Sequence, residues 1–407
     1  MKLKVLYISY DGMTDPLGQS QVLPYIIELS KQGFRFTILS FEKKERYNAE
    51  RKIIEKITAD SCINWVPLFF TARPPILSKL YDRWQLMRKA LQLQKREKFA
   101  IIHCRSYIAA EAGLRLKQKS GVKFLFDMRG FWADERVDNG QWDLKKPFYN
   151  KIYKHYKKKE KDFLLNADGI VSLTKAAKDF LLAKPEYRNI LIDVIPCCAD
   201  LNHFDFNKIS NKRLDELRNE LGIPAEKKII IYLGSIGGWY MTHEMFAFYK
   251  RLLLKYPEFV MLILTKDKKA TVINEAEAEG IPADKIFVNY ARRDEVPAYL
   301  GISECSIFFI RPTFSKTASS PTKHAELMGM GIPVICNDIG DTGNIIEATK
   351  TGLIVNAFSD LEYDKVVERL PELLNKSKEV IRNAAFEYFD LKMGTEKYAA
   401  LYSRILN

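Results

Sequence analysis

Short apolar runs alternate with longer stretches of helical hydrophobic spacing along the whole 407-residue chain. The runs are nearly continuous, which is typical of strands in parallel sheets that are covered on both faces. In the first half we expect strands at residues 3–10, 34–41, 100–106, 122–128 and 169–174. In the second half we expect them at residues 228–235, 260–266, 285–290, 305–312, 333–338 and 352–356. The pattern predicts an α/β protein with doubly wound parallel sheets.

This rhythm is interrupted between residues 197 and 228, where a polar stretch carries one charged helical pattern. We therefore place a boundary near Asp200 and expect two domains, 1–200 and 201–385, each long enough to bury a core of its own. Two such sheets facing one another form a cleft at the carboxyl ends of their strands. The amphipathic final segment, 386–407, packs either on the second domain or back across the boundary.

Composition excludes several classes of protein. Hydrophobic residues make up 47% of the chain, which argues against disorder, and the longest apolar runs are far shorter than the ~20 residues that cross a bilayer. The start of the chain reads as a first strand, not as a signal peptide. Six scattered cysteines without a CxxC pair indicate reduced thiols in a cytoplasmic protein. The five histidines form no HxH or HxxxH pair, so the sequence does not support a metal site. We expect no metal and no other cofactor.

The most informative stretch is "ASSPTKHAELMGMGIPVICND", residues 318–338. Ser320 is expected to cap a helix that begins at Pro321, so that the free amides near Thr322 can bind a phosphate. Lys323 adds a cation, and Glu326, one turn further, can accept hydrogen bonds from a ribose diol. The alternative is that Lys323 and Glu326 form only a solvated i,i+3 pair.

With these residues the sequence resembles the retaining glycosyltransferases of family 4, which have the GT-B fold of two facing Rossmann-like domains. The matching segments are "SPTKHAELMGMGIPVI", "IIIYLGS", "VIPCCADLNHF", "VNYARRDEVPAYL" and "KYAALYSRIL". The resemblance implies a nucleotide-sugar donor on the second domain, an acceptor on the first, Glu326 at the ribose, and a last helix that crosses back onto the first domain. It also implies attack from the side of the departing diphosphate, whose oxygen collects the proton.

The chain departs from the family pattern at three positions. Ala318 stands where a sugar-binding glutamate is usual, and Ser235 and Tyr240 stand where an Arg and Lys pair is usual. The cation for the leaving diphosphate must then come from elsewhere, and Lys323 is the first candidate. Weaker candidates at strand ends are Lys266, Arg292 and Arg293. Gly234, in "GSIGGW", either lets the backbone approach a phosphate or belongs to a plain turn.

In the first half, "FDMRGFWADERVDNGQWD", residues 126–143, concentrates charged and aromatic side chains after a strand. Sugars bind at such combinations because their ring faces pack on aromatic rings and their hydroxyls need polar partners. We assign acceptor binding to Asp127, Trp132, Asp134 and Glu135, with a surface loop anchored by tryptophans as the alternative. Arg129 lies nearest the place of a histidine in the family, and we assign it to stabilising the departing diphosphate.

The stretch "DPLGQSQVLPYI", residues 15–26, follows the first expected strand. Because proline belongs in the first turn of a helix, Pro24 indicates that "GQSQ" is a loop before that turn. No lysine accompanies it, so a primary phosphate loop is not expected. We assign Gln19 and Ser20 to the acceptor side, and Gly18 to a contact with the donor diphosphate.

Positive charge gathers in two segments, 79–98 and 145–161, within a formal net charge of +13. Aromatic residues beside lysines suit the headgroup region of an anionic membrane. Nucleic acid ranks lower because no known binding motif accompanies the charge, and a solvated surface is the remaining alternative.

The sequence therefore predicts a cytoplasmic glycosyltransferase, peripheral on the inner face of the plasma membrane. Its expected reaction moves a hexose, with retention, from a nucleoside-diphosphate sugar to a glycan or lipid-linked acceptor in cell-surface polysaccharide biosynthesis. A GT-B nucleotide-sugar epimerase or hydrolase, and a catalytically silent nucleotide-sugar-binding subunit, are the alternatives. The donor sugar, the nucleobase and the acceptor are not readable from the sequence.

Overall fold

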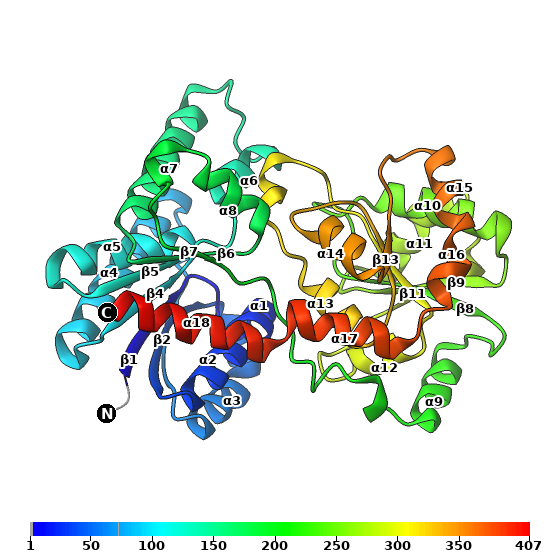
Figure 1. The fold of residues 1–407 in the computed structure, drawn as a ribbon, viewed down its shortest axis with the longest axis horizontal. Helices are drawn as coiled ribbons and strands as arrows, with labels where there is room; N and C mark the ends of the chain where they lie inside the picture. The colour runs from blue at the N-terminus through cyan, green and yellow to red at the C-terminus, as the bar shows by residue number, and fades with distance from the viewer. Residues whose placement is uncertain (1–2, 72) are drawn as a thin grey trace. The chain divides into compact units, whose positions relative to one another are not determined.

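The computed structural model describes residues 3–71 and 73–407, and its contacts divide the chain into two compact units (Figure 1). The first unit extends to Cys198 and also includes Thr317–Ser319 and Leu391–Asn407. The second unit consists of Ala199–Lys316 and Ser320–Asp390. Each unit is an α/β layer structure around its own parallel sheet.

The first unit contains a seven-stranded parallel sheet with the order β3-β2-β1-β4-β5-β6-β7. Its strands are β1 (Leu3–Ser9), β2 (Phe34–Glu42), β3 (Asn64–Phe69), β4 (Ile101–Arg105), β5 (Lys123–Asp127), β6 (Gly169–Ser172) and β7 (Ile192–Val194). The chain adds strands on one side of β1 and then on the other, so the strand order reverses between β1 and β4. Ligands of open α/β sheets bind at such switch points, beside the carboxyl ends of the strands.

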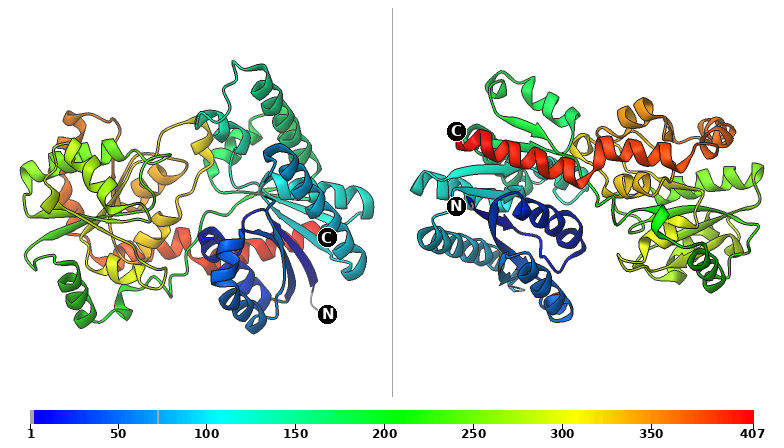
Figure 2. Two further views of the ribbon diagram at one scale, coloured as in Figure 1. Left: turned by 180° about the vertical axis from the view of Figure 1, so that it is seen from behind. Right: turned by 60° about the horizontal axis from the view of Figure 1, so that its bottom comes forward.

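Helices cover both faces of this sheet. They are α1 (Pro16–Gln21), α2 (Leu23–Lys31), α3 (Lys44–Asp60), α4 (Pro75–Glu97), α5 (Ser106–Ser120), α6 (Trp132–Asp138), α7 (Pro147–Asn166), α8 (Lys175–Leu182), the 3₁₀ turn η1 (Pro185–Tyr187) and α18 (Leu391–Leu406). One face packs against α4, α5 and α7, and the other against α2 and α18. The C-terminal helix α18 lies along α2, as the right view of Figure 2 shows, and buries Tyr398, Leu401, Tyr402 and Ile405.

The second unit contains a six-stranded parallel sheet with the order β10-β9-β8-β11-β12-β13. Its strands are β8 (Lys228–Leu233), β9 (Phe259–Leu264), β10 (Ile286–Asn289), β11 (Cys305–Phe308), β12 (Val334–Cys336) and β13 (Gly352–Ile354). Its helices are α9 (Asn211–Leu221), α10 (Thr242–Lys255), α11 (Lys269–Ala278), α12 (Val296–Gly301), α13 (Thr322–Gly329), α14 (Thr342–Thr349), α15 (Asp360–Glu368), α16 (Leu370–Leu374) and α17 (Lys378–Phe389). Three 3₁₀ turns complete it, η2 (Phe206–Lys208), η3 (Ala283–Lys285) and, on the link into the first unit, η4 (Phe314–Ala318).

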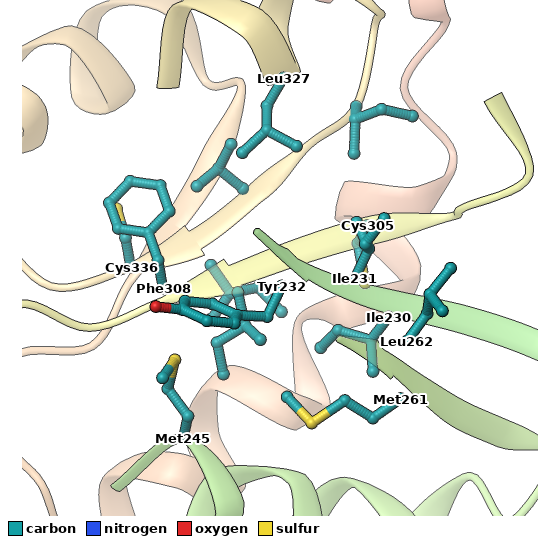
Figure 3. Packing of buried hydrophobic residues seen from close by; sticks show 14 of the residues in the cluster. Ile230, Ile231, Tyr232, Met245, Met261, Leu262, Cys305, Phe308, Leu327 and Cys336 are labelled. Carbon is teal, nitrogen blue, oxygen red and sulfur yellow. The ribbon is translucent and has the colours of Figure 1, made fainter. Parts of the chain in front are cut away.

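The core of the second unit lies where the central strands meet α10 and α13. Figure 3 shows Ile230, Ile231 and Tyr232 of β8 beside Met261 and Leu262 of β9, with Cys305 and Phe308 from β11, Cys336 from β12, Met245 from α10 and Leu327 from α13. All of these side chains are almost completely buried. The apolar runs of the strands thus fix the strand ends, and with them the positions of the loops that follow.

The predicted fold class, two Rossmann-like parallel-sheet domains of the GT-B type, is confirmed, and every strand that the apolar runs predict is present. Two strands at the edges, β3 and β7, were not predicted. The former contains Pro67 and is only half buried, and the latter has three residues, so neither makes a long apolar run. The prediction that "GQSQ" is a loop is wrong, because α1 includes it and Val22 alone separates α1 from α2.

Candidate functional site

Helix α13 presents its N-terminus at the carboxyl end of the second sheet, after β11 and the turn η4. The helix begins at Thr322, and Pro321 rather than Ser320 stands at the N-cap, so the predicted cap is wrong by one residue. Pro321 has extended backbone angles (φ −67°, ψ 116°), and its side chain has no atom that can accept from an amide. The amides of Thr322 and Lys323 precede the first hydrogen bonds within the helix and can serve an anion.

Lys323 is buried on α13, with 8% of its surface exposed. Its ammonium nitrogen lies 3.8 Å from the ring centre of Tyr240, 4.4 Å from that of Tyr232 and 5.7 Å from that of Phe308. Among the described residues this nitrogen has no hydrogen-bond partner. Burial lowers the pKa of Lys323 from 10.5 to about 7, against the opposing effect of Glu326. A buried ammonium held only by ring faces is prepared for an anion that the free protein lacks.

The loop after β8 makes room for this lysine. Gly234 has φ +132°, and a Cβ built on it would lie 3.0 Å from the Lys323 nitrogen and 3.2 Å from the Tyr232 hydroxyl. The Tyr232 hydroxyl donates to the carbonyl of Ser235 at 2.6 Å. Glycine is therefore favoured at 234, because side chains rarely adopt this backbone angle and a Cβ here would crowd the ammonium group. The sequence singled out this glycine but gave no sign of the ring cluster behind it.

Glu326 lies one turn further along α13 and pairs with Arg293, not with Lys323. Its Oε1 is 3.0 Å from Nη1 of Arg293, and the side chain of Glu326 is 13% exposed. Burial raises the pKa of Glu326, while the Arg293 guanidinium works in the opposite direction. The alternative interpretation of Lys323 and Glu326 as a solvated i,i+3 pair is therefore wrong. Among the described residues only Oε1 of Glu326 has a side-chain partner, so that Oε2 can accept from a ligand hydroxyl.

An open pocket of about 530 Å³ lies at the carboxyl ends of β9 and β10. Its lining residues are Thr265, Lys266, Asp267, Lys269, Val288, Asn289 and Tyr290. The Lys266 ammonium lies 5.2 Å from the ring centre of the half-exposed Tyr290. Asp267 accepts from the amide of Ile236 at 2.7 Å, which ties the pocket to the loop after β8. Arg292, in contrast, is exposed and pairs with Asp294 at 3.3 Å.

In the first unit a buried polar cluster lies at the carboxyl ends of β4 and β5, next to the switch point. Asp127, the last residue of β5, is 1% exposed. Its Oδ2 accepts from the Tyr398 hydroxyl of α18 at 3.2 Å and lies 3.5 Å from Nε2 of His103. Nη1 of Arg129 is 3.8 Å from the other oxygen, Oδ1. Asp127 thus orients Arg129 from within the unit.

The charges of this cluster are set by its two arginines. Burial works to raise the pKa of Asp127, but Arg129, His103 and Arg105 outweigh it, so the pKa lies below its ordinary value. Burial lowers the pKa of His103, which keeps that ring neutral. Arg105 donates through Nε to Asp11 at 3.2 Å, and among the described residues its buried Nη1 has no partner. The cluster therefore holds a guanidinium group that an anionic or hydroxyl-bearing ligand can still use.

Arg129 occupies the left-handed region of the backbone, with φ +59°, and its Nη2 donates to Cys197 Sγ at 3.2 Å. A strained backbone together with a fixed guanidinium is an arrangement common in functional sites. No local pattern indicates the partners His103, Tyr398 and Cys197, because they are far from Arg129 in the chain. The signal that was available is a charged residue at the end of each apolar strand run, as in "AIIHCR" and "KFLFD".

The other predicted acceptor residues of the first unit have partners within it. Trp132 stacks on Tyr107 with ring centres 5.9 Å apart, and the Arg136 guanidinium lies 4.6 Å from its ring centre. Asp134 accepts from the Tyr153 hydroxyl and from Lys157, both at 2.8 Å. Glu135 follows half-buried on the same short helix, α6. Their roles at an acceptor stay predictions.

Helix α1 holds the remaining predicted residues. Gly18 is buried, and a Cβ on it would lie 2.1 Å from the carbonyl oxygen of Gly12, so the close approach here is to the protein's own backbone. Gln19 donates to the carbonyl of Thr14 at 3.4 Å, and Ser20 donates to that of Pro16 at 2.8 Å.

Comparison with known proteins agrees with this geometry. Residues 21–203 match the family model described as Glycosyltransferase Family 4, and residues 214–386 match that of Glycosyl transferases group 1. The two models together cover both units, and the chain therefore belongs to the glycosyltransferases of the GT-B fold.

Individual relatives are distant. The D-inositol 3-phosphate glycosyltransferase of Corynebacterium jeikeium is 19% identical over 67% of this chain and 64% of its own length. The curated relatives that the chain matches are covered over 62%, 44% and 64% of their lengths. A glycosyltransferase structure from Rickettsia africae superposes over 100% of this chain and 99% of that chain, with a TM-score of 0.69 and 19% identity. The structure of Anabaena HepE in complex with UDP and glucose superposes with a TM-score of 0.67 and 14% identity, over 98% of this chain and 99% of that chain.

Proposed function

We propose that the protein transfers a sugar, with retention, from a nucleoside-diphosphate donor to a glycan or lipid-linked acceptor. The observation that carries this proposal is the Lys323 ammonium, which is buried without a partner at the N-terminus of α13. A diphosphate is a ligand that satisfies the ammonium and the free amides together. The likeness to HepE, whose structure contains UDP and glucose, supports a nucleotide sugar.

The donor can be laid out along the carboxyl end of the second sheet. Its nucleoside would occupy the pocket lined by Lys266 and Tyr290, its ribose would reach the free oxygen of Glu326, and its diphosphate would reach Lys323. Arg293 holds the Glu326 carboxylate in place for the ribose. Gly234 and Ser235 border the diphosphate, and Ser320 and Thr322 lie at the start of the helix that receives it. Arg292 stays at the rim.

The proposed chemistry needs no protein nucleophile. The bond from the anomeric carbon to the diphosphate breaks, the acceptor oxygen attacks from the same side, and a phosphate oxygen takes the proton of the acceptor hydroxyl. Lys323 and the α13 amides stabilise the negative charge of the leaving group, and Arg129 is proposed to assist them. We expect transfer to continue in EDTA, since the chain contains no Asp-x-Asp pair.

Thermal-shift screening with UDP, GDP, ADP and CMP tests the donor site. At least one nucleotide should raise the melting midpoint, and Glu326→Ala and Lys323→Ala should abolish that rise. Lys365→Ala is the matched control, because the side chain of Lys365 is 62% exposed and its i,i+3 pair with Glu362 is 3.7 Å long. A nucleotide response that survives in both site variants would refute the proposed donor site.

The product distinguishes the remaining alternatives. Transfer to an acceptor with the anomeric configuration of the donor, read by NMR, supports the retaining transferase. Conversion or hydrolysis of the nucleotide sugar without an acceptor favours the epimerase or hydrolase. Binding without any turnover favours a silent subunit, which Ala318 in place of the usual glutamate would explain. We propose that the enzyme is cytoplasmic and that it acts in the assembly of a cell-surface polysaccharide.

A further inference from the structure

The first two turns of α4 have an inverted distribution of polar and apolar side chains. Ser78 and Asp82 face the interior, with 5% and 2% of their surfaces exposed. The opposite side exposes Leu77 (64%), Leu80 (53%), Tyr81 (50%) and Trp84 (52%). Single exposed apolar residues are ordinary, but these four form one contiguous helix face, which we call the α4 apolar face. Tyr81 and Trp84 stack with ring centres 5.6 Å apart.

The exposed charges of the segment that carries the α4 apolar face are all positive. Asp82 is the one acidic residue in the sequence from 73 to 96. It is buried, and its carboxylate accepts a hydrogen bond from the amide of Thr71. Arg73, Lys79 and Arg88 are exposed. The fold therefore hides the acid and presents cations beside the apolar side chains, which complements an anionic surface.

A second segment of the same unit has the same character. Phe148, in the first turn of α7, is 61% exposed, and its exposed neighbours include Lys145, Lys146 and Lys151. Helix α5 lies between α4 and α7 (Figure 1), and Arg83 of α4 pairs with Glu111 of α5 at 2.5 Å. The three helices thus form one continuous layer of the first unit.

The remainder of α7 does not belong to this surface. Lys157, in the middle of the helix, pairs with Asp134 at 2.8 Å and with Glu160 at 2.5 Å. The burial pattern therefore divides the basic segment 145–161 into an exposed start and a later part tied into the unit's interior. It also extends the first segment, 79–98, toward the N-terminus to include Leu77.

The starts of both helices lie at the carboxyl end of the first sheet. Helix α4 begins after the end of β3, and α7 begins after β5 and α6, and crossover helices run antiparallel to the strands they connect. Arg105 and Asp127 lie at this same end of the sheet. A surface that contacted both helix starts would therefore lie near the polar cluster of the first unit.

We propose that the α4 apolar face and Phe148 insert into the headgroup region of an anionic lipid bilayer. Tryptophan and tyrosine favour that region, and lysine and arginine beside them bind anionic lipids. In the part of the chain that the structure describes, no helix is long and apolar enough to cross a membrane. Contact at the carboxyl end of the first sheet selects, within the proposed transferase function, an acceptor carried on a lipid over a free glycan.

Sedimentation with vesicles of phosphatidylcholine, with and without phosphatidylglycerol, tests the surface. The protein should bind the anionic vesicles, and the triple variant Leu80→Ser, Tyr81→Ser, Trp84→Ser should bind on the order of 100-fold more weakly. Lys79→Gln, Lys145→Gln and Lys146→Gln should each weaken binding about fivefold. Leu254→Ser with Leu361→Ser is the matched control, because these leucines of the second unit are 71% and 69% exposed.

Fluorescence and hydrodynamic measurements distinguish a lipid surface from a second copy of the chain as the partner of the α4 apolar face. Trp84 is the one tryptophan among the exposed large apolar residues of the described chain, and its emission should shift to the blue with anionic vesicles. Unchanged emission, or equal vesicle binding by the triple variant, would overturn the proposal. So would a lipid-free dimer that the triple variant converts to monomers, since a second copy would then cover the face.

The acceptor class is tested separately from the surface. With the donor that stabilises the protein, a lipid-linked sugar in anionic vesicles should be at least tenfold better than the same sugar in solution. The triple variant should lose that advantage and keep its thermal response to nucleotide. Equal use of both acceptors would refute the lipid-linked class, whereas absence of any nucleotide response would refute the donor site and leave the vesicle result intact.

Discussion

Replacing Lys323 by methionine should stabilise the free protein and weaken its binding of a nucleotide sugar. The free protein keeps an ammonium group buried among Tyr232, Tyr240 and Phe308, with no hydrogen-bond partner among the described residues. Methionine fills a similar volume and needs no partner. A residue whose loss improves stability while it impairs binding is one retained for its ligand.

The magnitude follows from the lowered pKa of Lys323. A lysine that is protonated up to pH 10.5 in the unfolded chain, but only up to about 7 in the folded chain, destabilises the fold by ~4 kcal/mol at pH 7. Between these two values the unfolded chain binds more protons, so this group makes the free energy of unfolding rise with pH. The gain from Lys323→Met should therefore shrink to ~2 kcal/mol at about pH 9.

Calorimetry, with the nucleotide that the thermal-shift screen identifies, measures both effects. At about pH 7 the midpoint of the transition that responds to nucleotide should rise by roughly 10 °C in Lys323→Met, and by about half as much at about pH 9. The wild type should bind the stabilising nucleotide about tenfold more weakly for each pH unit above 7, because Lys323 must then take up a proton when the nucleotide binds. The methionine variant should show no such slope.

The exposed Lys365→Met is the control and should change neither property. A lower melting midpoint in Lys323→Met, together with unchanged affinity for the nucleotide, would refute the reasoning. Lys323 would then be part of the structural core and not of a ligand site.

Three further substitutions test other parts of the molecule. Arg382→Met should lower the free energy of unfolding by about 3–5 kcal/mol, measured by urea denaturation, because Arg382 donates to the carbonyls of Phe204, Gly329 (2.5 Å) and Leu201 (2.6 Å) in the interior. Glu42→Gln should cost about 2 kcal/mol and raise KM for the acceptor, because the Glu42 carboxylate accepts four hydrogen bonds, from the amides of Met13 and Thr14 and from two hydroxyls, that shape the loop after β1. Gly18→Val should impair transfer more than nucleotide binding, because its side chain must displace the backbone at Gly12, and equal loss of both would contradict this assignment.

The sequence was sufficient for the elements whose signal lies within a few neighbouring residues. Each buried strand is a nearly continuous apolar run, and the stretch around Pro321 carries its own signs of a helix start after a strand. The edge strand β3 was missed because Pro67 and its half-buried side chains break the run. Helix α1 was missed because Pro16 and Pro24 both suit a first turn, and only the tight fit of Gly18 against Gly12 distinguishes the two arrangements.

The candidate site was predictable as a set of residues but not as a set of partners. Lys323 and Glu326 were identified from one helix, yet their neighbours come from the distant positions Tyr232, Tyr240 and Arg293. Such pairings depend on the sheet order, which brings β8 beside β11, and no local pattern encodes it. The inverted face of α4 was hidden for a similar reason, because its sequence does not reveal which side packs on the sheet.

The place of α18 in the first unit has a consequence for synthesis on the ribosome. Tyr398, Leu401, Tyr402 and Ile405 complete one of the two apolar cores of that unit, and they are synthesised after the whole second unit. The second unit, which ends at Asp390, can therefore finish folding before the first does, although the first is translated earlier. Until α18 leaves the exit tunnel, the nascent first unit exposes the apolar surface that α18 will cover. A chain truncated before Leu391 should keep this apolar surface exposed and should therefore aggregate more readily than the chain that includes α18.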